Sequence, residues 1–385
     1  MSQRSLLIDV SRLIWRLWRG GLPTGVDRVC LAYVEHFGDR SQAVIQWGGR
    51  QVVLSPGRSD QLLRAILSGP GRFRAAFATL MVAALATSRH RPPRSGMLYL
   101  NVGHTGLDDP HLARWIKEAG VRPIFLVHDL IPLTHPEYCR PGEASRHRSR
   151  MRNVLSTATG IIGNSQSTLD QLHRFADAEG LSMPSSVAAF IAGLPPVPDA
   201  KPKRFDRPHF VTIGTIEGRK NHLLLLHIWR QLVARKGQLA PLLVIVGQRG
   251  WEAGQTFAML DRAADLRGHV LELRRCGDAE LAGLILGSRA LLMPSFVEGF
   301  GLPIVEAFRL GTPVIASDLP VFREFAGEIP TYLDPIDGIG WEQTISAFLK
   351  DPGEYERQRS ALSEYRPPEW SDHFEVVERW LANIR

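Results

Sequence analysis

Cysteine is scarce in this chain of 385 residues. Its three cysteines, Cys30, Cys139 and Cys276, are scattered along the sequence. An odd number at that spacing fits neither a disulfide framework nor a zinc cluster built from paired cysteines. We therefore expect the protein to work in a reducing compartment, the cytoplasm.

Long apolar runs are also missing. The first one, Leu6–Val10, is short and contains Asp9, so we expect no secretory leader. A second stretch, Phe73–Thr87, is too short and too rich in alanine to span a bilayer, which takes about 20 residues. The chain is, however, long enough for two separate hydrophobic cores, and we expect two domains.

Lysine is almost absent from the first 200 residues, where Lys117 is the only one. That part still holds 23 Lys and Arg against 15 Asp and Glu, whereas the remainder holds 23 against 24. The excess positive charge favours an acidic partner, either anionic lipid or nucleic acid. The alternative is that these arginines simply lie on the solvent-exposed surface. Because no nucleic-acid-binding motif accompanies the charge, we expect no nucleic-acid partner.

One basic segment, Ser11–Arg19, places three arginines around Trp15 and Trp18. A basic, aromatic and amphipathic helix is able to lie on an anionic membrane surface. The alternative is ordinary helix packing with the arginine ends in water. Peripheral contact with the inner face of the cytoplasmic membrane is therefore one of two interpretations that the sequence leaves open.

Short apolar runs alternate with helical patterns along most of the chain, and this alternation predicts parallel sheets with helices on both faces. The order occurs twice, on either side of a segment rich in Pro, Lys and Asp, Leu194–Pro208, which we interpret as a linker. We expect a ligand to bind between two such domains, at the carboxyl ends of their strands. The predicted strands are Leu6–Val10, Met97–Val102, Ile124–Val127, Gly160–Gly163, Phe210–Gly214, Leu242–Gly247, Val270–Leu273, Ala290–Met293 and Thr312–Ala316.

The most informative segment is Glu298–Glu306, with the sequence EGFGLPIVE. It follows the apolar run Ala290–Met293 and combines a glycine-rich turn with the start of a helix. Strand, glycine turn and helix in this order let backbone N–H groups approach an anionic ligand closely. The two flanking carboxylates are suited to accept hydrogen bonds from sugar hydroxyls.

From Phe210 to Gly327 the chain resembles the family 4 glycosyltransferases, which are retaining enzymes of the GT-B fold that use nucleotide sugars. Bacterial polysaccharide mannosyltransferases are the members that it resembles most. The motifs that carry the resemblance are GTIEGRKN (214–221), CGDAEL (276–281), MPSFVEGFGLPIVEA (293–307) and GTPVIASDLPVFREFAG (311–327).

The rest of the chain matches the family less densely but in the family's order. The similar segments there are LPTGVDRV (22–29), VHDLIPLTHPEY (127–138), IIGNSQSTLDQL (161–172) and EWSDHFEVVERWL (369–381). The resemblance implies two Rossmann-like domains facing each other across a cleft. It also implies the boundaries: an acceptor-binding domain over 1–195, a nucleotide-sugar domain over 208–365, and a helix over 366–385 that returns to the first domain.

Two positions depart from the family pattern. Many members carry an arginine where this chain has Thr215, and the neighbouring Arg219 is a candidate to supply that charge. The usual Asn-Gly turn before the linker is Ala192-Gly193 here, which keeps the glycine that the turn requires.

The predicted donor site centres on two cations. The departing diphosphate is anionic, and Lys220 assisted by Arg219 is suited to stabilise the charge that grows on it. Cations are disfavoured at a helix start, so a bound anion would compensate them there, whereas solvated side chains are the plainer interpretation. The further donor-binding residues that we expect from the resemblance are Gly25, Thr215, Gly277, Gly299, Phe300, Gly301, Leu302 and Glu306.

The resemblance also assigns roles near the sugar. It implies that Glu306 holds the ribose hydroxyls and that Glu298 contacts the hydroxyls of the donor sugar as a catalytic residue. His128 matches the family's donor-site histidine, which bonds the sugar and steadies positive charge at the anomeric carbon. Asp129 either orients His128 or caps the following turn, and Gly25 is either a diphosphate-facing glycine or a plain turn glycine.

We expect no metal and no cofactor beyond the nucleotide sugar that serves as substrate. Asp108-Asp109 is the only carboxylate pair suggestive of a metal, and it precedes Pro110 at a helix start, where aspartate is a good cap. No residue is indicated as a covalent nucleophile. The resemblance implies same-face attack, with the departing phosphate activating the acceptor hydroxyl.

These expectations combine into one function and one alternative. The first is transfer of a hexose, with mannose from GDP-mannose as the first candidate, to a polysaccharide or lipid-linked oligosaccharide during bacterial surface glycan synthesis. The alternative is a non-catalytic subunit of a glycan assembly complex that binds a nucleotide sugar or a glycan.

Overall fold

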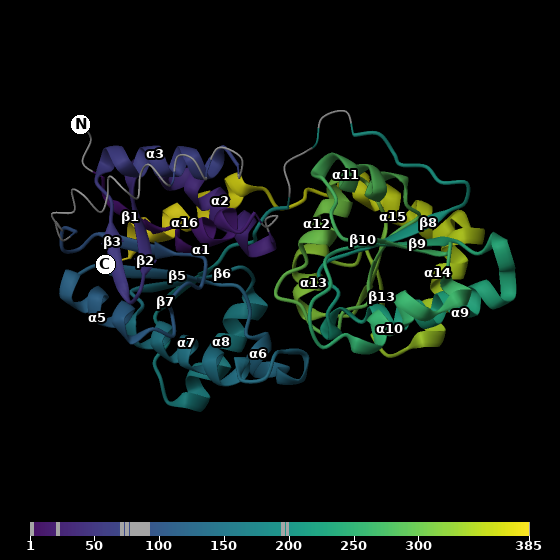
Figure 1. Ribbon diagram of the computed structural model, residues 1–385, viewed down its shortest axis with the longest axis horizontal. Coiled ribbons are helices and arrows are strands. Elements are labelled where there is room, and N and C mark those ends of the chain that lie inside the picture. Colours follow the sequence, from purple (N-terminus) through teal and green to yellow (C-terminus); the bar gives the residue numbers. More distant parts are fainter. Residues whose placement is uncertain are drawn as a thin grey trace. The chain divides into compact units, whose positions relative to one another are not determined.

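The chain folds into two compact units in the computed structural model (Figure 1). Unit 1 comprises residues 1–130, 145–191 and 370–385, and unit 2 comprises residues 131–144 and 192–369. The structure describes residues 4–20, 24–69, 73, 77, 93–193, 197 and 200–384. Most of the apolar segment Phe73–Thr87 and part of the predicted linker lie outside the described residues.

Unit 1 is built on a seven-stranded sheet with the order β3-β2-β1-β4-β5-β6-β7. All neighbouring strands are parallel except β3, which pairs antiparallel to β2 at the edge. Four of the strands follow the apolar runs predicted from the sequence, whereas β2, β3 and β7 were not predicted. The strands are β1 (Leu6–Asp9), β2 (Ser41–Trp47), β3 (Arg50–Val53), β4 (Leu98–Asn101), β5 (Arg122–Val127), β6 (Gly160–Gly163) and β7 (Ser185–Ala188).

Helices cover both faces of this sheet. In Figure 1, α2, α3 and α16 lie on one side, and α5, α7 and α8 lie on the other. The helices are α1 (Ser11–Trp18), α2 (Gly25–Phe37), α3 (Pro56–Leu67), α5 (Pro110–Ala119), α7 (Glu143–Thr157), α8 (Gln166–Glu179) and α16 (Trp370–Asn383). Asp109 accepts a hydrogen bond from the backbone N–H of His111, so the cap predicted for Asp108-Asp109 is confirmed.

The C-terminal helix α16 packs within unit 1 through buried polar contacts. Its His373 Nε2 lies 2.9 Å from the hydroxyl of Tyr33 on α2, and Nδ1 of the same ring faces the carbonyl oxygen of Phe190. These contacts satisfy polar groups that burial would otherwise leave without partners. The last helix therefore belongs to the core of unit 1 rather than to the unit that precedes it in the sequence.

Unit 2 contains a six-stranded, fully parallel sheet with the order β10-β9-β8-β11-β12-β13. Central strand β9 is buried along its whole length, as expected for a parallel sheet that is covered on both faces. The strands are β8 (His209–Ile213), β9 (Leu242–Val246), β10 (Val270–Leu273), β11 (Leu291–Met293), β12 (Val314–Ser317) and β13 (Thr331–Leu333).

The helices of unit 2 again cover both faces, with α9 and α10 on one side and α11 and α15 on the other (Figure 1). Trp229 of α9 and Trp341 of α14 are fully buried in the core that α9 forms with the sheet. The helices are α6 (Ile131–Thr134), α9 (His222–Lys236), α10 (Gly254–Arg262), α11 (Asp278–Gly287), α12 (Leu302–Arg309), α13 (Pro320–Ala326), α14 (Gly338–Lys350) and α15 (Pro352–Glu364).

Both sheets reverse their strand order at one point, beside β1 in unit 1 and beside β8 in unit 2. Ligands of such doubly wound folds bind outside the carboxyl ends of the strands at this point. The predicted α/β class with two doubly wound units is confirmed. The loops after β8 and β11 in unit 2, and after β1, β4 and β5 in unit 1, are consequently the places to look for a site.

Candidate functional site

The loop after β8 brings a lysine side chain against a glycine. Gly214 adopts a φ of +137°, and a Cβ added to it would lie 3.3 Å from Lys220 Nζ. A Cβ on Gly247, which follows β9, would lie 1.9 Å from the carbonyl oxygen of Gly214. Side chains at either position would therefore push this loop out of place, so the glycines let Lys220 fold back over the end of the sheet.

Glu298, in the loop after β11, binds both cations of the β8 loop. Its Oε1 lies 2.5 Å from Lys220 Nζ, and its Oε2 lies 2.6 Å from an Arg219 guanidinium nitrogen. The hydroxyl of Ser295 donates a third hydrogen bond, 2.7 Å long, to Oε1. Lys220 and Glu298 are each only 9% exposed. The structure thus brings together three charged residues that the sequence predicted to share a site, and it joins them directly to one another.

A second carboxylate, Glu217, completes this cluster. It lies 2.6 Å from the other terminal nitrogen of Arg219, and its side chain is 3% exposed. The cluster of Glu217, Arg219, Lys220 and Glu298 therefore holds two positive and two negative charges, which balance each other. Glu217 was not predicted from the sequence. Its position two residues before Arg219, in the loop rather than on the helix, could have indicated an ion pair with that arginine.

Burial and charge oppose each other within the cluster. Burial by itself raises the pKa of Glu298, but attraction by Arg219 and Lys220 outweighs it and holds that pKa at about 2. Burial lowers the pKa of Lys220 and raises the pKa of Glu217. A group that is desolvated to this degree stays ionised only while its partners stay in place. An anion that takes over one carboxylate's partners would therefore be bound strongly.

The glycine turn predicted to face an anion contains a strained glycine at the start of α12. Gly301 has a φ of +121°, and a Cβ there would lie 2.7 Å from a ring carbon of Phe322. Only glycine fits this position, because both the backbone conformation and the close ring exclude a side chain. Gly299, Phe300 and Leu302 are the adjoining residues of the turn, so the predicted donor-binding amides lie together at the N-terminus of α12.

Glu306 lies on α12, one turn past the glycine loop, and is 7% exposed. A Cβ added to Gly193 would lie 3.0 Å from Glu306 Cγ. The Ala192-Gly193 turn predicted from the sequence therefore packs its backbone directly against this glutamate, which accounts for glycine there. Thr215 packs beside Gly250, and Gly277 caps α11, where its carbonyl oxygen accepts from Leu281 N.

A segment from the first half of the sequence contacts the loop after β8 that carries Arg219 and Lys220, which we call the cation loop. Residues 131–144 belong to unit 2, and the ring of Tyr138 stacks on Phe296 with ring centroids 5.3 Å apart. The indole Nε1–H of Trp251 donates to Tyr138 O at 3.1 Å. The backbone N–H of Phe296 in turn donates to Arg219 O at 2.8 Å. This chain of contacts holds the Arg219 backbone in place, and sequence reasoning did not foresee it.

His128, the predicted donor-site histidine, belongs to unit 1 and follows the end of β5. It is 6% exposed, and its Nε2 lies 2.7 Å from Val102 O, which requires the ring proton on Nε2. Burial lowers the pKa of His128 to about 4, so the ring is neutral near pH 7. The remaining nitrogen, Nδ1, is then a hydrogen-bond acceptor rather than a donor.

Two further histidines surround His128 and were not predicted. The His104 ring centroid lies 4.9 Å from that of His128, and His104 has a φ of +57°, which is strained for a residue with a side chain. His147 faces Asp129 O at 3.2 Å. The strained His104 stands in the segment NVGHTG after β4, where two glycines flank it. Such a sequence could have indicated a functional turn.

Unit 1 also carries buried polar groups at the carboxyl ends of β1 and β4. Asp9 accepts from Gln46 Nε2 and from the Tyr99 hydroxyl, both at 2.8 Å, and burial raises the pKa of Asp9. Asn101 is fully buried, and its Oδ1 has no hydrogen-bond partner among the described residues. Gly25, the remaining predicted site residue, is the first residue of α2 in this unit.

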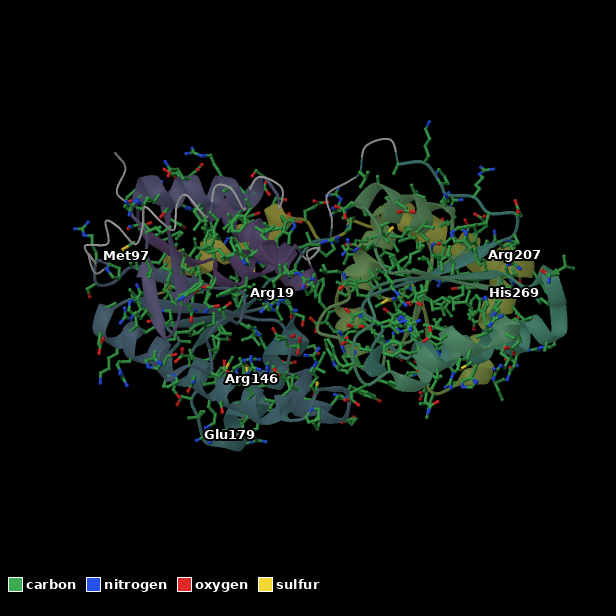
Figure 2. The ribbon with its side chains drawn as sticks, viewed as in Figure 1. Arg19, Met97, Arg146, Glu179, Arg207 and His269 are labelled. Carbon is green, nitrogen blue, oxygen red and sulfur yellow. The ribbon has the colours of Figure 1, made fainter. Side chains whose placement is uncertain are left out.

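Several arginines of unit 1 form ion pairs with carboxylates of the same unit. Arg146 pairs with Asp108, and both Arg148 and Arg152 pair with Glu179; Figure 2 labels Arg146 and Glu179. These contacts cover a large part of the arginine-rich helix α7. The arginines of this helix therefore fit the interpretation of a solvated surface, and they give little support to a polyanionic partner.

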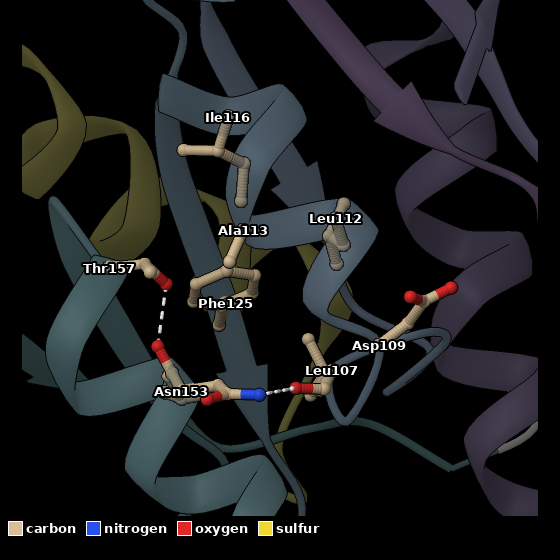
Figure 3. A pocket seen from close by; sticks show the side chains of 9 residues that line it. Leu107, Asp109, Leu112, Ala113, Ile116, Phe125, Asn153 and Thr157 are labelled. Atoms are coloured by element: carbon tan, nitrogen blue, oxygen red, sulfur yellow. Dashed lines mark hydrogen bonds between the residues drawn. The ribbon is translucent and has the colours of Figure 1, made fainter. Parts of the chain in front are cut away.

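A small hollow of about 10 Å³ lies under α5 in unit 1 (Figure 3). Its volume suits about one water molecule. Leu107, Leu112 and Phe125 contribute to its apolar lining, and Asn153 donates to Leu107 O at 2.8 Å, so its polar groups are already satisfied. None of the predicted site residues lines it. Within the described ranges, no three His, Cys, Asp or Glu side chains are grouped to hold a metal ion, and no helix is long and apolar enough to cross a membrane.

Comparison with known proteins shows what part of the chain is similar to a known family. Residues 197–365 match the family model described as glycosyl transferases group 1. The chain is 30% identical over 243 residues to the serotype-specific mannosyltransferase WbdA of Escherichia coli, which covers 56% of this chain and 28% of WbdA. It is 36% identical over 125 residues to the O-antigen chain mannosyltransferase B of Escherichia coli, which covers 32% of each protein. The chain thus spans about a third or less of the length of these curated relatives.

The fold has solved counterparts along the whole chain. The structure of Anabaena HepE in complex with UDP and glucose superposes with a TM-score of 0.67, covering 99% of this chain and 100% of that chain at 14% sequence identity. At that identity the likeness establishes the fold. The chain therefore has the GT-B fold, and its residues 197–365 are similar to the glycosyl transferases group 1 family.

Proposed function

We propose that this protein transfers a hexose, with retention of configuration, from a nucleotide diphosphate sugar to a polysaccharide or lipid-linked oligosaccharide in bacterial surface glycan synthesis. The observation that carries the proposal is the buried cluster at the carboxyl ends of β8 and β11, where Lys220 and Arg219 converge on Glu298. Two cations beside the glycine turn of α12 are suited to a diphosphate.

The charge balance of the cluster suggests how the donor binds. Without a ligand, the two carboxylates neutralise the two cations. An arriving diphosphate competes with Glu298 for Lys220 and Arg219, and Glu298 is then released toward the hydroxyls of the donor sugar. As the glycosidic bond breaks, negative charge grows on the leaving phosphate oxygen, and Lys220 and Arg219 stabilise it in a site that excludes water.

The remaining roles follow the same proposal. Glu306, buried on α12, holds the ribose hydroxyls. His128 is neutral at pH 7 and accepts a hydrogen bond from a sugar hydroxyl through Nδ1, because its Nε2 proton is engaged by Val102 O. The departing phosphate takes the proton of the acceptor hydroxyl, so this reaction needs neither a covalent nucleophile nor a metal.

We propose mannose as the transferred sugar and GDP-mannose as its donor. The support is that the relatives named above are mannosyltransferases. UDP-glucose is the donor to compare first, since Anabaena HepE was solved with UDP and glucose. The corresponding place of action is the inner face of the cytoplasmic membrane, where lipid-linked acceptors are presented. The support for that place of action is the class of acceptor proposed. The net positive charge of the first 200 residues adds little to it, because the arginines of α1 and α7 are largely paired with carboxylates.

The test is a panel of GDP-, UDP- and dTDP-sugars, with release of nucleoside diphosphate measured in the presence of glycan acceptors. We expect one donor to be turned over and turnover to be lost in Lys220→Ala and Glu306→Ala. Glu272→Gln is the matched control, because Glu272 of unit 2 also binds two arginines, Arg249 and Arg274, but belongs to a separate ion-pair network.

Each outcome of this panel has a definite meaning. Loss in both site variants with normal turnover in Glu272→Gln supports the assigned site. Turnover in Lys220→Ala equal to that of the wild type contradicts it. Calorimetric binding of one nucleotide sugar without turnover for any acceptor would favour the alternative, a non-catalytic subunit that binds a nucleotide sugar.

A further inference from the structure

Three tryptophans of unit 1 are exposed to solvent, and the proposed chemistry uses none of them. Trp15 is 39% exposed, Trp18 is 47% exposed and Trp47 is 53% exposed. The rings of Trp15 and Trp47 stack on each other, with centroids 5.1 Å apart and an interplanar angle of 21°. A large aromatic surface left in water is unfavourable for an isolated unit, so this tryptophan pair points to a binding partner.

The tryptophan pair lies at the edge of the sheet where ligands of this fold bind. Strand β2 ends at Trp47, and β1, which is parallel to β2, ends at Asp9 and leads into α1 with Trp15. The carboxyl ends of both strands therefore meet at the edge that also carries the loop of His128. Within α1, the residue three positions before Trp15 is Arg12, and a Cβ on Gly103, in the loop after β4, would lie 3.1 Å from Arg12 Cβ. Residues three apart on a helix lie about 5–6 Å from each other.

Hydrogen-bonding groups border the tryptophan pair. Arg12 Nε lies 2.7 Å from Asp27 Oδ1, and Arg16 Nε lies 3.3 Å from Asp27 Oδ2. Asp27 also accepts from the backbone N–H of Thr24 at 2.8 Å, so its orientation is fixed. Asp27 itself is buried, whereas the side chains of Arg12 and Arg16 that it orients are 36% and 33% exposed. A flat aromatic face beside such oriented guanidinium donors suits a pyranose ring, whose C–H face packs on the electron-rich ring while its hydroxyls accept from the guanidinium groups.

We propose that the Trp15–Trp47 pair is an acceptor subsite that binds a pyranose unit of the growing glycan, away from the hydroxyl that receives the new sugar. This proposal rests on the proposed function and deepens it, because it names the class of acceptor: an oligosaccharide long enough to extend from the His128 loop to the tryptophan pair. The tryptophan pair then favours elongation of existing chains over the first transfer to a short acceptor.

The charge of α1 favours a glycan over a lipid surface as the occupant. Asp27 offsets part of the charge of Arg12 and Arg16, which leaves Arg19 (labelled in Figure 2) as the one arginine of the segment without a carboxylate partner among the described residues. A single basic residue near an anionic membrane contributes only about 1 kcal/mol, and stable anchoring takes two signals. Uncharged sugar hydroxyls, by contrast, are well matched to the partly exposed guanidinium groups of Arg12 and Arg16, whose charge the buried Asp27 partly offsets.

The test compares long and short acceptors in kinetics with Trp47→Ala, Trp47→Phe and Arg19→Ala. Trp47 is half exposed, so these changes leave the core intact, and Leu239→Ala, at an 84% exposed apolar side chain in unit 2, is the matched control. We expect Trp47→Ala to raise KM for a long glycan acceptor by several-fold to about tenfold, which is the range of aromatic contact energies. KM for the donor and for a short acceptor stays unchanged. Trp47→Phe keeps most of the affinity, and Arg19→Ala has little effect.

The other outcomes overturn the proposal. An unchanged KM for long acceptors in Trp47→Ala excludes the subsite, as does an equal rise for short ones. If Trp47→Ala no longer sediments with vesicles rich in phosphatidylglycerol, as the wild type does, while its KM for the acceptor is unchanged, the tryptophan pair binds a membrane instead. If the wild type transfers no sugar at all, the proposed function fails separately. Calorimetric titration of the same oligosaccharide into wild type and Trp47→Ala then decides the subsite, and equal or absent binding refutes it.

Discussion

Replacing Glu298 by glutamine should destabilise the ligand-free protein in a pH-dependent way. Arg219 and Lys220 hold the pKa of Glu298 at about 2 against an ordinary value of 4.5, even though burial acts in the opposite direction. A difference of this size corresponds to about 3 kcal/mol of stabilisation. Because the folded-state pKa is the lower one, this contribution is complete above pH 4.5 and is lost as the pH falls from 4.5 to 2.

Urea or thermal unfolding of wild type and Glu298→Gln measures the effect. We expect Glu298→Gln to lose about 3 kcal/mol at pH 7, which lowers the midpoint by several degrees for a unit of this size. The difference between the two proteins should shrink below pH 4.5. Saturating nucleoside diphosphate should restore much of the stability of Glu298→Gln, because the phosphate oxygens take over the two cations.

The reasoning is refuted if Glu298→Gln unfolds at the wild-type midpoint at pH 7, or if its deficit does not change between pH 7 and pH 3. A double-mutant cycle with Lys220→Met gives a further check. Since the second change removes the cation that the first leaves buried without its partner, the double variant should be less destabilised than the sum of the single variants.

Three further predictions concern other parts of the molecule. Gly301→Ala should lose at least about 2 kcal/mol of unfolding free energy in a denaturant titration, because the added Cβ would lie 2.7 Å from an aromatic ring of α13 at a φ of +121°. Burial holds the pKa of His222 at about 3 and that of His373 at about 4, so the unfolded chain binds more protons than the folded protein below pH 6.5. The free energy of unfolding should therefore fall as the pH drops from 6.5 to 4. A urea midpoint that stays constant over that range contradicts this prediction. Trp251→Phe removes the donor to Tyr138 O and should raise KM for the donor more than it changes kcat, whereas an unchanged KM would show that residues 131–144 do not position the cation loop.

The fold was largely predictable because buried parallel strands have continuous apolar sequences. Nine such runs in the sequence match strands of the structure. Two of the missed strands lack that signal: β7 is Ser-Ser-Val-Ala and lies at an edge, and β13 has only three residues, all partly exposed. Strand β2 does contain a buried apolar run, Ala43–Ile45, which was overlooked. Strand β3 pairs antiparallel through a hairpin, which departs from the parallel pattern of the rest of the sheet.

The candidate site was predictable in its members but not in its internal contacts. The motifs identified Arg219, Lys220 and Glu298, and the sequence suggested that they face a ligand. In the structure they bind each other, because charges that are buried must be paired. Glu217 and Tyr138 were missed because their roles depend on packing between segments far apart in the chain, which no local pattern encodes.

A crystal structure with a bound nucleoside diphosphate tests the central claim most directly, namely that Arg219 and Lys220 hold the diphosphate of a sugar donor. The account predicts phosphate oxygens about 3 Å from Lys220 Nζ and from the Arg219 guanidinium, with Glu298 turned away from at least one of these cations. A diphosphate bound elsewhere, with Lys220 and Arg219 still paired to Glu298, would contradict it.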